Sequence, residues 1–421
     1  MFAHKTINQC RVCGFQELDS ILFLGDQYVV NFIDSLDQEQ LRSPLELVLC
    51  NKNKGGCGFL QLRHTFSQSK MYDTYWYRSG VNKTMTEELV GIARKAESMV
   101  ALNPGDFIID IGSNDSTLLR GFAKPNFNLV GFEPAKNLMP YAEHGVTKII
   151  NDFFNYEAWQ KNFGSAKAKV ITAIAMFYDL EEPNKFIEDI VKCLDQEGVF
   201  IVQQNYLPYM LERNIVDNVS HEHLGYYSLS TFKYLLDKHG LEVFDIELND
   251  VNGGSMRTYI KHKGGKKTIK ISEGATERIA TLLKEEEGKR LSDKTTYDAF
   301  AARVSAIKDN LYNFVKNEAE TGEKIYVYGA STRGNSLLQF CGIDHRLIIA
   351  AADRNPDKWG KKTVGTLIPI ISEEQARSEK PDYFLILPWQ FINEFIKREE
   401  EYLKNGGKFI VPLPEFKIIT A

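Results

Sequence analysis

The sequence lacks any apolar run long enough to cross a membrane. Its longest apolar runs, such as 107–109 and 199–202, span only a few residues, whereas a membrane helix needs about 20. The first residues lead straight into polar ones, without the apolar region of a signal peptide. Positive charge is not in excess either, since the formal net charge is −5 over 421 residues, which is not typical of a nucleic-acid-binding protein. We therefore expect a cytoplasmic protein whose partners include neither a membrane nor a nucleic acid.

Cysteine is scarce, and its placement is uneven. Of six cysteines, four lie in the first 57 residues. In a cytoplasmic chain such clustering indicates a metal rather than disulfides. Cys10 and Cys13 form a C-x2-C-G knuckle, and Cys50 and Cys57 are spaced C-x6-C. Four thiolates satisfy a tetrahedral, structural Zn²⁺. His4 and His64 are conceivable substitute ligands, and a set of buried thiols without metal is the alternative.

The length and the apolar pattern predict an α/β protein with more than one domain. A chain of 421 residues exceeds one ordinary core. Residues 86–101 read as an amphipathic helix, and short apolar runs then alternate with segments of helical length, which is typical of a doubly wound sheet. The predicted domains are a small zinc-binding domain, a central Rossmann-like domain, and a helical linker with a C-terminal Rossmann-like α/β domain, at residues 1–66, 67–263 and 264–421. The predicted strands lie at 45–49, 107–111, 129–132, 148–150, 170–175, 199–203, 324–328, 347–352, 383–387 and 408–411.

The linker begins at a break, 264–267, and its helix-prone part spans 276–318. It reads as a helical linker or a dimerising arm, and the charge run 284–287 within it as a solvated helix face. We expect a monomer or a homodimer.

The most informative stretch is the loop after the first strand of the central domain. Gly112 lets the backbone approach a ligand closely, and a helix is expected to start near Ser116. Asp110 ends the strand, where ligands bind in open α/β sheets. A dinucleotide loop would read G-x-G-x-x-G, but its second and third glycines are absent here. Asp110 and Asp115 would repel phosphates and suit a cationic ligand such as S-adenosylmethionine, and Asn114 lies between them.

Two further strands end in residues that fit the same cofactor. Glu133 follows the second strand and can accept hydrogen bonds from both ribose hydroxyls. Asp152 and Phe153 follow the third, where they could bond the adenine amine and lie against the ring. Each residue could instead be a cap or turn residue. It is Asp110, Gly112 and Glu133 together that favour the cofactor.

A His-Glu-His segment follows the strand at 199–203. His221, Glu222 and His223 lie on a predicted loop that faces the methyl donor. A histidine can take up a proton near neutral pH, and a neighbouring carboxylate can orient it. The alternatives are metal chelation, for which no third ligand is evident, and a helix cap, because a helix is predicted from Ser228 to His239.

The C-terminal unit has a glycine loop of its own. The loop 329–335 follows a strand and opens a helix, and Asp353 ends the next strand, which taken alone would suggest NAD. Arg333 at the helix start could hold a phosphate. Arg257 is another phosphate candidate or a surface ion pair, and a fold kept only for packing is the remaining alternative.

Taken in order, these motifs resemble those of the bacterial sugar C-methyltransferases that act on nucleotide-linked keto-deoxysugars, the C-3′-methyltransferase type. The resemblance covers nearly the whole chain. It rests on C-R-V-C-G (10–14), C-G-F-L-Q-L (57–62), D-I-G-S-N-D (110–115), S-H-E-H-L (220–224), G-G-S-M-R (253–257), Y-G-A-S-T-R-G-N (328–335) and A-D-R-N-P-D-K (352–358).

The resemblance implies an S-adenosylmethionine-dependent methyltransferase (class EC 2.1.1) with a zinc-binding N-terminal domain. It implies that His223 removes the proton beside a C4 ketone, with Glu222 next to it and Tyr77 near the sugar. The C-terminal loop, with Arg333 and Asn335, is implied to hold the nucleotide sugar.

The chain departs from the family pattern at two positions around the sugar. Ser220 stands where the family often has Tyr, and Tyr178 where it often has His. The C-x6-C spacing is also longer than usual. The departures leave the sugar, the carbon and C- against O-methylation open. An O-methyltransferase, an NAD-dependent sugar oxidoreductase and a binding protein without turnover are the alternatives.

Overall fold

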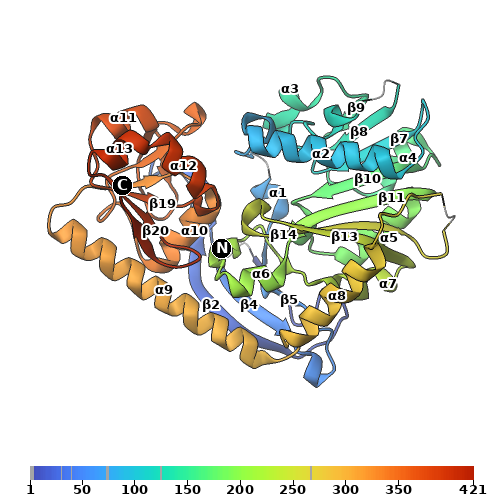
Figure 1. Ribbon diagram of the computed structural model, residues 1–421, viewed down its shortest axis with the longest axis horizontal. Coiled ribbons are helices and arrows are strands. Elements are labelled where there is room, and N and C mark those ends of the chain that lie inside the picture. Colours follow the sequence, from blue (N-terminus) through green and yellow to red (C-terminus); the bar gives the residue numbers. More distant parts are fainter. Residues whose placement is uncertain (1–3, 30, 39, 73–74, 124–125, 266–267) are drawn as a thin grey trace.

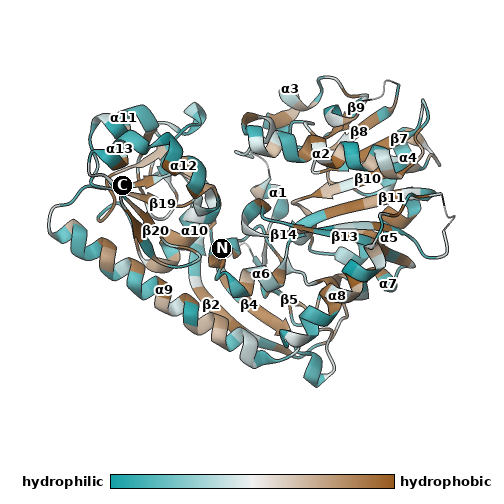
Figure 2. Cartoon of the chain, in the orientation of Figure 1, coloured by the Kyte–Doolittle hydropathy of each residue, from teal (hydrophilic) through white to brown (hydrophobic). Residues whose placement is uncertain are grey.

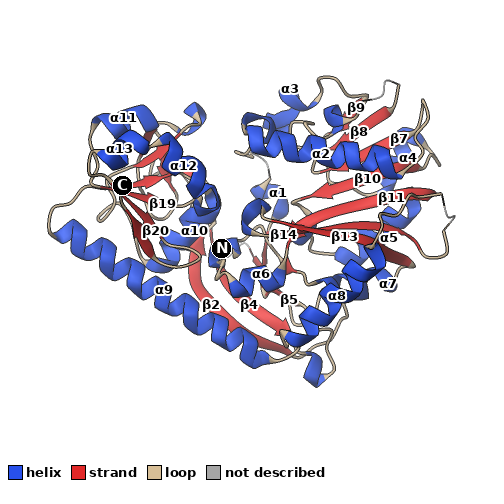
Figure 3. Cartoon of the chain, viewed as in Figure 1, coloured by secondary structure: helices blue, strands red, loops and turns tan. Residues whose placement is uncertain are grey.

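Three parts make up the chain, a small antiparallel sheet and two larger α/β parts, and in the view of Figure 1 they are arranged roughly as a V. The computed structural model describes residues 4–421 except 30, 39, 73–74, 124–125 and 266–267. Lys266 and Lys267 of the predicted break therefore lie outside the described residues. The N-terminal strands lie at the base of the V, the central sheet on one arm and the C-terminal sheet on the other (Figures 1 and 3). Within the described part of the chain, no helix is long and apolar enough to span a membrane.

The N-terminal part is an antiparallel sheet that borrows a strand from the central part. Its order is β12-β5-β4-β2, and a separate pair joins β1 to β6. A further short pair joins β3 to β17 of the C-terminal part. The strands are β1 (His4–Thr6), β2 (Leu18–Tyr28), β3 (Phe32–Ile33), β4 (Arg42–Cys50), β5 (Leu60–Leu62), β6 (His64–Phe66), β12 (Gly225–Tyr226) and β17 (Lys362–Thr363). The first part of the chain is thus tied to both others.

The central part is a seven-stranded sheet in the order β13-β14-β11-β10-β7-β8-β9. The strands β11, β10, β7, β8 and β9 are parallel to one another. Strand β14 is antiparallel to both of its neighbours, β11 and β13. The strand order reverses between β7 and β10, which is where open α/β sheets bind ligands. The strands are β7 (Phe107–Ile111), β8 (Asn128–Phe132), β9 (Lys148–Ile150), β10 (Ala168–Ile174), β11 (Leu194–Asn205), β13 (Leu241–Asn249) and β14 (Ser255–His262).

The helices of the central part start at polar capping residues. Asn82 accepts a hydrogen bond from the amide of Met85 and begins α2, and Ser228 forms a capping box with Thr231 at the start of α7. Both helices confirm the sequence prediction. The helices are α1 (Gln68–Met71), α2 (Lys83–Met99), α3 (Met139–Ala142), α4 (Tyr156–Phe163), α5 (Pro183–Cys193), α6 (Leu207–Glu212) and α7 (Leu229–Asp237).

The prediction of a helix that starts near Ser116 was wrong. Asn114 and Ser116 both have positive φ angles (53° and 62°), which a right-handed helix cannot accommodate. Only a 3-10 turn, η3 (Leu119–Gly121), follows the loop.

Two helices link the central and C-terminal parts. They are α8 (Ala275–Gly288) and α9 (Lys294–Glu320), so the predicted helical stretch is interrupted at 289–293. The apolar face of α9 recurs every three or four residues and is buried: Tyr297, Phe300, Val304, Ile307, Leu311 and Val315. Of the charge run 284–287, Glu286 is buried (3% exposed) and was wrongly taken as part of a solvated face. Its carboxylate accepts hydrogen bonds from the amides of Leu229 and Ser230 and so caps α7.

The C-terminal part is a six-stranded sheet in the order β18-β16-β15-β19-β20-β21, with only β21 antiparallel to its neighbour. The strands are β15 (Ile325–Tyr328), β16 (Ala351–Asp353), β18 (Ile370–Ser372), β19 (Tyr383–Ile386), β20 (Lys408–Val411) and β21 (Lys417–Ile419), and the helices are α10 (Thr332–Cys341), α11 (Glu373–Ser378), α12 (Ile392–Arg398) and α13 (Glu400–Lys404). The strand predicted at 347–352 is shorter than expected, because the amides of Leu347 and Ile348 bond the carbonyl of Asp344 in a turn. Apolar strands and more polar helices are evident in Figure 2.

Candidate active site and zinc centre

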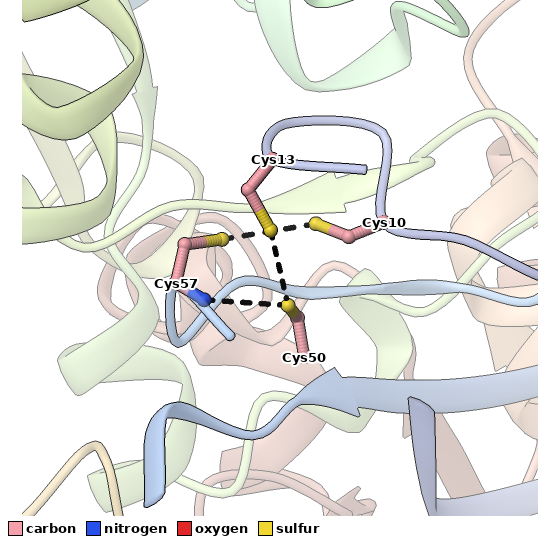
Figure 4. Close-up of side chains that lie close together, drawn as sticks. All are labelled: Cys10, Cys13, Cys50 and Cys57. Atoms are coloured by element: carbon pink, nitrogen blue, oxygen red, sulfur yellow. Dashed lines mark hydrogen bonds between the residues drawn. The ribbon is translucent and has the colours of Figure 1, made fainter. Parts of the chain in front are cut away.

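The four N-terminal cysteines converge on one point. Their Sγ atoms all lie within 4.8 Å of one another, with 3.7 Å between Cys10 and Cys57 and 3.4 Å between Cys13 and Cys50 (Figure 4). A tetrahedral Zn²⁺ with Zn–S bonds of about 2.3 Å requires sulfur atoms about 3.8 Å apart, so the spacing fits the metal. His4 and His64 are not part of this group, and the Nδ1 atom of His64 lies 3.1 Å from Thr6 Oγ1. The predicted set of four cysteines therefore comes together.

The loops around the cysteines are shaped for thiolates. Backbone amides point at two of the sulfurs: Val12 N at Cys10 Sγ (3.4 Å) and Cys57 N at Cys50 Sγ (3.3 Å). A Cβ atom on Gly56 would lie 2.5 Å from Cys50 Sγ, so only glycine fits there. The knuckle also docks on the central part, since Asn184 and Lys238 bond the carbonyl of Val12. These hydrogen bonds hold the cysteine knuckle against α5 and the end of α7 in the central part.

The predicted cofactor residues Asp110, Gly112 and Glu133 lie together at the carboxyl ends of β7 and β8. Asp110 is 4% exposed and accepts a hydrogen bond from Thr172 Oγ1 (2.6 Å). Burial, with a smaller contribution from the charge of Glu133, raises the pKa of Asp110 to about 7. Glu133 accepts hydrogen bonds from the amides of Asn114 (2.8 Å) and Ala135 (2.9 Å), and burial raises its pKa as well. Two buried acids in one pocket favour a cationic ligand.

The side chains of Asn114 and Asp115 bind the backbone of the aromatic segment that precedes α2 (Tyr72 and residues 75–80). The Asn114 amide accepts a hydrogen bond from Ser79 N (3.0 Å) and donates one to the carbonyl of Tyr77 (2.9 Å). Asp115 accepts a hydrogen bond from Gly80 N (2.8 Å). Both side chains thus fix the backbone at Tyr77 and just after it, and Tyr77 is 45% exposed.

Asp152 and Phe153 lie just beyond β9. The carboxylate of Asp152 accepts a hydrogen bond from the Phe153 amide (2.8 Å). The Phe153 ring is 38% exposed and meets the ring of Tyr72 edge-on, with centroids 6.1 Å apart. The aromatic segment therefore reaches over the edge of the sheet where the cofactor residues lie.

His223 is buried and held in one tautomer. Its Nδ1 lies 2.7 Å from the carbonyl oxygen of Asn218, so Nδ1 donates and Nε2 keeps a free lone pair. The ring meets that of Tyr178 at 4.5 Å between centroids. Burial and, to a smaller extent, the positive charge of Arg333 lower the pKa of His223 to about 3. The histidine is therefore neutral over the whole range in which it could act as a base.

The neighbours of His223 have different surroundings. His221 donates from Nε2 to the carbonyl of Ser43 (2.9 Å) and so joins this segment to β4. Burial raises the pKa of Glu222 to about 7. Ser220 is 4% exposed, and its hydroxyl has no hydrogen-bond partner among the described residues.

The predicted substrate residues Arg333, Asn335 and Arg257 differ in position. Arg333 lies 3.0 Å from Asp217 in the turn η6 (Val216–Asn218), beside the His-Glu-His segment. Asn335 is 1% exposed and is engaged internally with Val364 and Thr366. Arg257 is in an ion-pair network with Glu88 and Glu247, away from the C-terminal loop.

A cavity of about 220 Å³ lies where the three parts meet. Its walls include Phe32, Trp76, Tyr77, Glu222, Ser331 and Lys358. It combines aromatic faces, an acid and the start of α10 with a lysine, which together can contact a sugar, a base and a phosphate.

In the C-terminal loop, the acid that an NAD site would offer to a ribose is already engaged. Asp353 accepts hydrogen bonds from the amide of Ala330 (2.9 Å) and from Lys358 (3.1 Å). A Cβ on Gly329 would lie 2.6 Å from Pro388, so the loop is packed against its own domain.

Sequence reasoning missed three residues of this site. Asp217 and Asn218 hold Arg333 and His223, and Asp179 bonds Tyr72. The available signal was their position, because Asp179 directly follows Tyr178 after a strand, and Asp217 and Asn218 precede the His-Glu-His segment.

Family models match three consecutive segments: a zinc binding domain at 10–72, a methyltransferase domain at 85–246 and a C-methyltransferase C-terminal domain at 250–414. The family matches, the fold and the four-cysteine centre together define an S-adenosylmethionine-dependent methyltransferase with a zinc-binding module. The chain is 30% identical to the C-methyltransferase NovU of Streptomyces niveus over 421 residues, which covers 99% of this chain and 98% of NovU. It belongs to this C-methyltransferase family.

Solved structures align with less than half of the chain. A methyltransferase from Clostridium acetobutylicum is 14% identical over 42% of this chain and 91% of its own, with a TM-score of 0.33. Magnesium protoporphyrin IX methyltransferase from Synechocystis is 10% identical over 43% and 79%, with a TM-score of 0.31. These scores are too low to add to the assignment.

Proposed function

We propose that the enzyme methylates a carbon of a nucleotide-linked keto-deoxysugar, with His223 as the base that forms the enolate. The observation that carries this proposal is the bond from His223 Nδ1 to the Asn218 carbonyl (2.7 Å), which leaves Nε2 free to accept a proton. A C–H bond beside a ketone is too weakly acidic for water to break quickly, so a positioned base is needed.

The low pKa of His223 sets the state of the base. Because burial keeps the imidazole neutral, it is ready to accept a proton at any physiological pH. A histidine of low pKa is a weak base in its resting surroundings, so the proton it accepts must be stabilised in the complex. In the proposal Glu222, the residue before His223 and part of the cavity wall, supplies a compensating negative charge as it ionises near a pH of about 7.

The cofactor pocket is assigned to the acids of β7 and β8. Bound S-adenosylmethionine supplies the electrophilic methyl group. In the proposal Glu133 accepts the ribose hydroxyls and Gly112 lets the backbone pass close by, while the buried Asp110 favours the positive charge of the ligand. Asn114 and Asp115 fix the loop, and Asp152 and Phe153 lie at the adenine end.

The nucleotide sugar is assigned to the cavity between the three parts. In the proposal Arg333, in the first turn of α10, and Lys358, in the cavity wall, contact the phosphates. Tyr77, in the cavity wall, and Tyr178, whose ring meets that of His223, contact the sugar. Ser220 leaves room where a larger side chain would reach the sugar. Asn335 supports the loop at the start of α10 through its internal hydrogen bonds. Arg257 contributes to the site indirectly, through its ion pairs with Glu88 and Glu247.

The test is hydrogen exchange in deuterium oxide without methyl donor, using thymidine- and guanosine-diphosphate-linked 4-keto-6-deoxyhexoses. The C-methyltransferase must exchange the proton on the carbon beside the ketone, and His223→Asn must slow that exchange by about 10²–10⁴. Methylation of such a sugar without exchange would mean O-methylation with His223 deprotonating a hydroxyl.

A further inference from the structure

Asp179 is an acid close to Glu222 and Tyr72, with no role in the assignments above. It ends the turn η5 (Phe177–Asp179), which follows β10 at the carboxyl edge of the central sheet. Its Oδ2 accepts a hydrogen bond from the hydroxyl of Tyr72 (3.0 Å). Its Oδ1 is buried and has no hydrogen-bond partner in the part of the chain that the structure describes. One oxygen is fixed and the other is left for a ligand.

The surroundings of Asp179 disfavour its negative charge. Burial is the main cause that raises its pKa well above the usual range, and the charge of Glu222 raises it further, while the Tyr72 hydroxyl acts in the opposite direction. The other titratable groups whose protonation depends on Asp179 are the phenols of Tyr75, Tyr178 and Tyr226. An acid faced by another acid and by phenols is held in its neutral form.

The contact with Tyr72 leaves one oxygen of Asp179 available to a ligand. Tyr72 engages Oδ2, and Oδ1 has no partner among the described residues, so a carboxyl proton on Oδ1 is the one that a ligand oxygen can meet. Asp179 directly follows Tyr178, whose ring contacts His223. Glu222, the residue before His223, acts on the pKa of Asp179, so this carboxyl group lies close to the His-Glu-His segment.

This inference rests on the proposed C-methylation: we propose that Asp179 is a catalytic residue whose neutral Oδ1–H donates a hydrogen bond to the enolate oxygen. In that step the C–H bond breaks and its proton goes to His223 Nε2. The C–H electron pair becomes the C–C π bond, and the carbonyl π pair moves to the oxygen. The Asp179 proton stays on Oδ1 and shares the charge of that oxygen, as neutral carboxylic acids do in other enolising sites.

The exchange reaction without methyl donor tests the role of Asp179. Removing one donor to an oxyanion costs about 10²–10³ in rate, so Asp179→Leu is expected to slow exchange by that factor. Asp179→Asn keeps a donor and the acceptor for Tyr72. It is expected to lose at most about tenfold and to abolish the fall in rate at alkaline pH, because its amide does not ionise.

The fall in exchange rate at alkaline pH is the alkaline limb of the pH profile. Variants of two neighbouring residues are expected to shift the pH of this limb in opposite directions. Tyr72→Phe removes the contact that lowers the pKa of Asp179, so the limb moves to higher pH. Glu222→Gln removes the charge that raises it, so the limb moves to lower pH. Glu182→Gln, an exposed acid on the same loop, is the matched control and is expected to leave the limb in place.

Infrared difference spectroscopy of the substrate-free enzyme locates the proton directly. Carbonyl bands of protonated carboxylic acids are expected at neutral pH from Asp179 and in part from Asp110 and Glu222, whose pKa values lie near 7. Asp179→Asn is expected to remove one band that Glu182→Gln and Glu222→Gln retain. Retention of every band in Asp179→Asn would overturn the proposal, as would an unchanged alkaline limb in that variant. Failure of the wild type to exchange any of the keto-sugars would instead contradict the proposed function.

Discussion

The guanidinium of Arg333 lies 3.0 Å from the carboxylate of Asp217, one residue before the carbonyl that holds His223. Trp389 donates a second, longer hydrogen bond to the same carboxylate oxygen (3.3 Å). The C-terminal part thereby fixes the turn that orients the proposed base. If the enzyme acts as proposed, Arg333 takes part both in binding the substrate phosphates and in orienting the base.

Replacing Arg333 is expected to change the acid limb of the exchange reaction. The positive charge of Arg333 lowers the pKa of His223, so Arg333→Met raises that pKa and moves the acid limb to higher pH. The Michaelis constant for the nucleotide sugar is expected to rise as well. Arg333→Lys keeps the charge and serves as the comparison, and a pH profile that is the same in both variants would remove Arg333 from this role.

His223→Asn is expected to separate binding from turnover. General base catalysis contributes about 10²–10⁴ in rate, so exchange should fall by that factor. Calorimetric titration with S-adenosylhomocysteine should give an affinity close to that of the wild type. His144→Asn changes an exposed histidine of the same part and is the control. Exchange near the wild-type rate in His223→Asn would assign the base elsewhere.

Gly56→Ala is expected to destroy the zinc centre. The new Cβ would lie 2.5 Å from Cys50 Sγ and 2.9 Å from the Asn51 carbonyl oxygen, which forces the loop apart. Zinc content by mass spectrometry and the melting temperature should both fall. Gly91→Ala, on the exposed face of α2 with no atom within 4 Å of the new Cβ, should keep its zinc and gain about 0.5–1 kcal/mol. Full zinc occupancy in Gly56→Ala would contradict this account of the loop.

Asp110 is expected to make the ligand-free enzyme less stable as pH rises. Its pKa is 3.8 in a free side chain and about 7 in the fold, so the folded state binds the proton more tightly than the unfolded state. The stabilisation is complete below a pH of about 4 and is lost as pH rises through about 7. Asp110→Asn should flatten this part of the stability profile, measured by chemical denaturation. An identical slope in both proteins would show that Asp110 ionises normally.

The strands and the metal ligands could be predicted because each depends on local sequence. The apolar runs of β7 and β9 agree with their predicted limits, and the four cysteines converge although their second spacing is long. Metal ligation needs only the right side chains and loops able to close around one point.

Contacts between distant segments could not be read in the same way. Asn114 and Asp115 were predicted as cofactor residues. What the sequence did not indicate is that their side chains bind the backbone at 77–80, more than thirty residues earlier. Glu286 looked solvated, yet it caps α7. The backbone groups that these side chains satisfy carry no signal in the sequence, because each becomes a partner only when the chain is folded.

Strand β5 pairs with β12 of the central part, and β3 pairs with β17 of the C-terminal part. Residues 4–66 therefore cannot be exchanged between relatives as an independent domain. In a chimaera, exchange of this segment alone would change one side of each of two sheets, and it would also change one wall of the cavity. Recombination within this family should succeed only when β12 and β17 come from the same relative as the N-terminal segment. Residues 4–66 are therefore expected to evolve together with the rest of the chain.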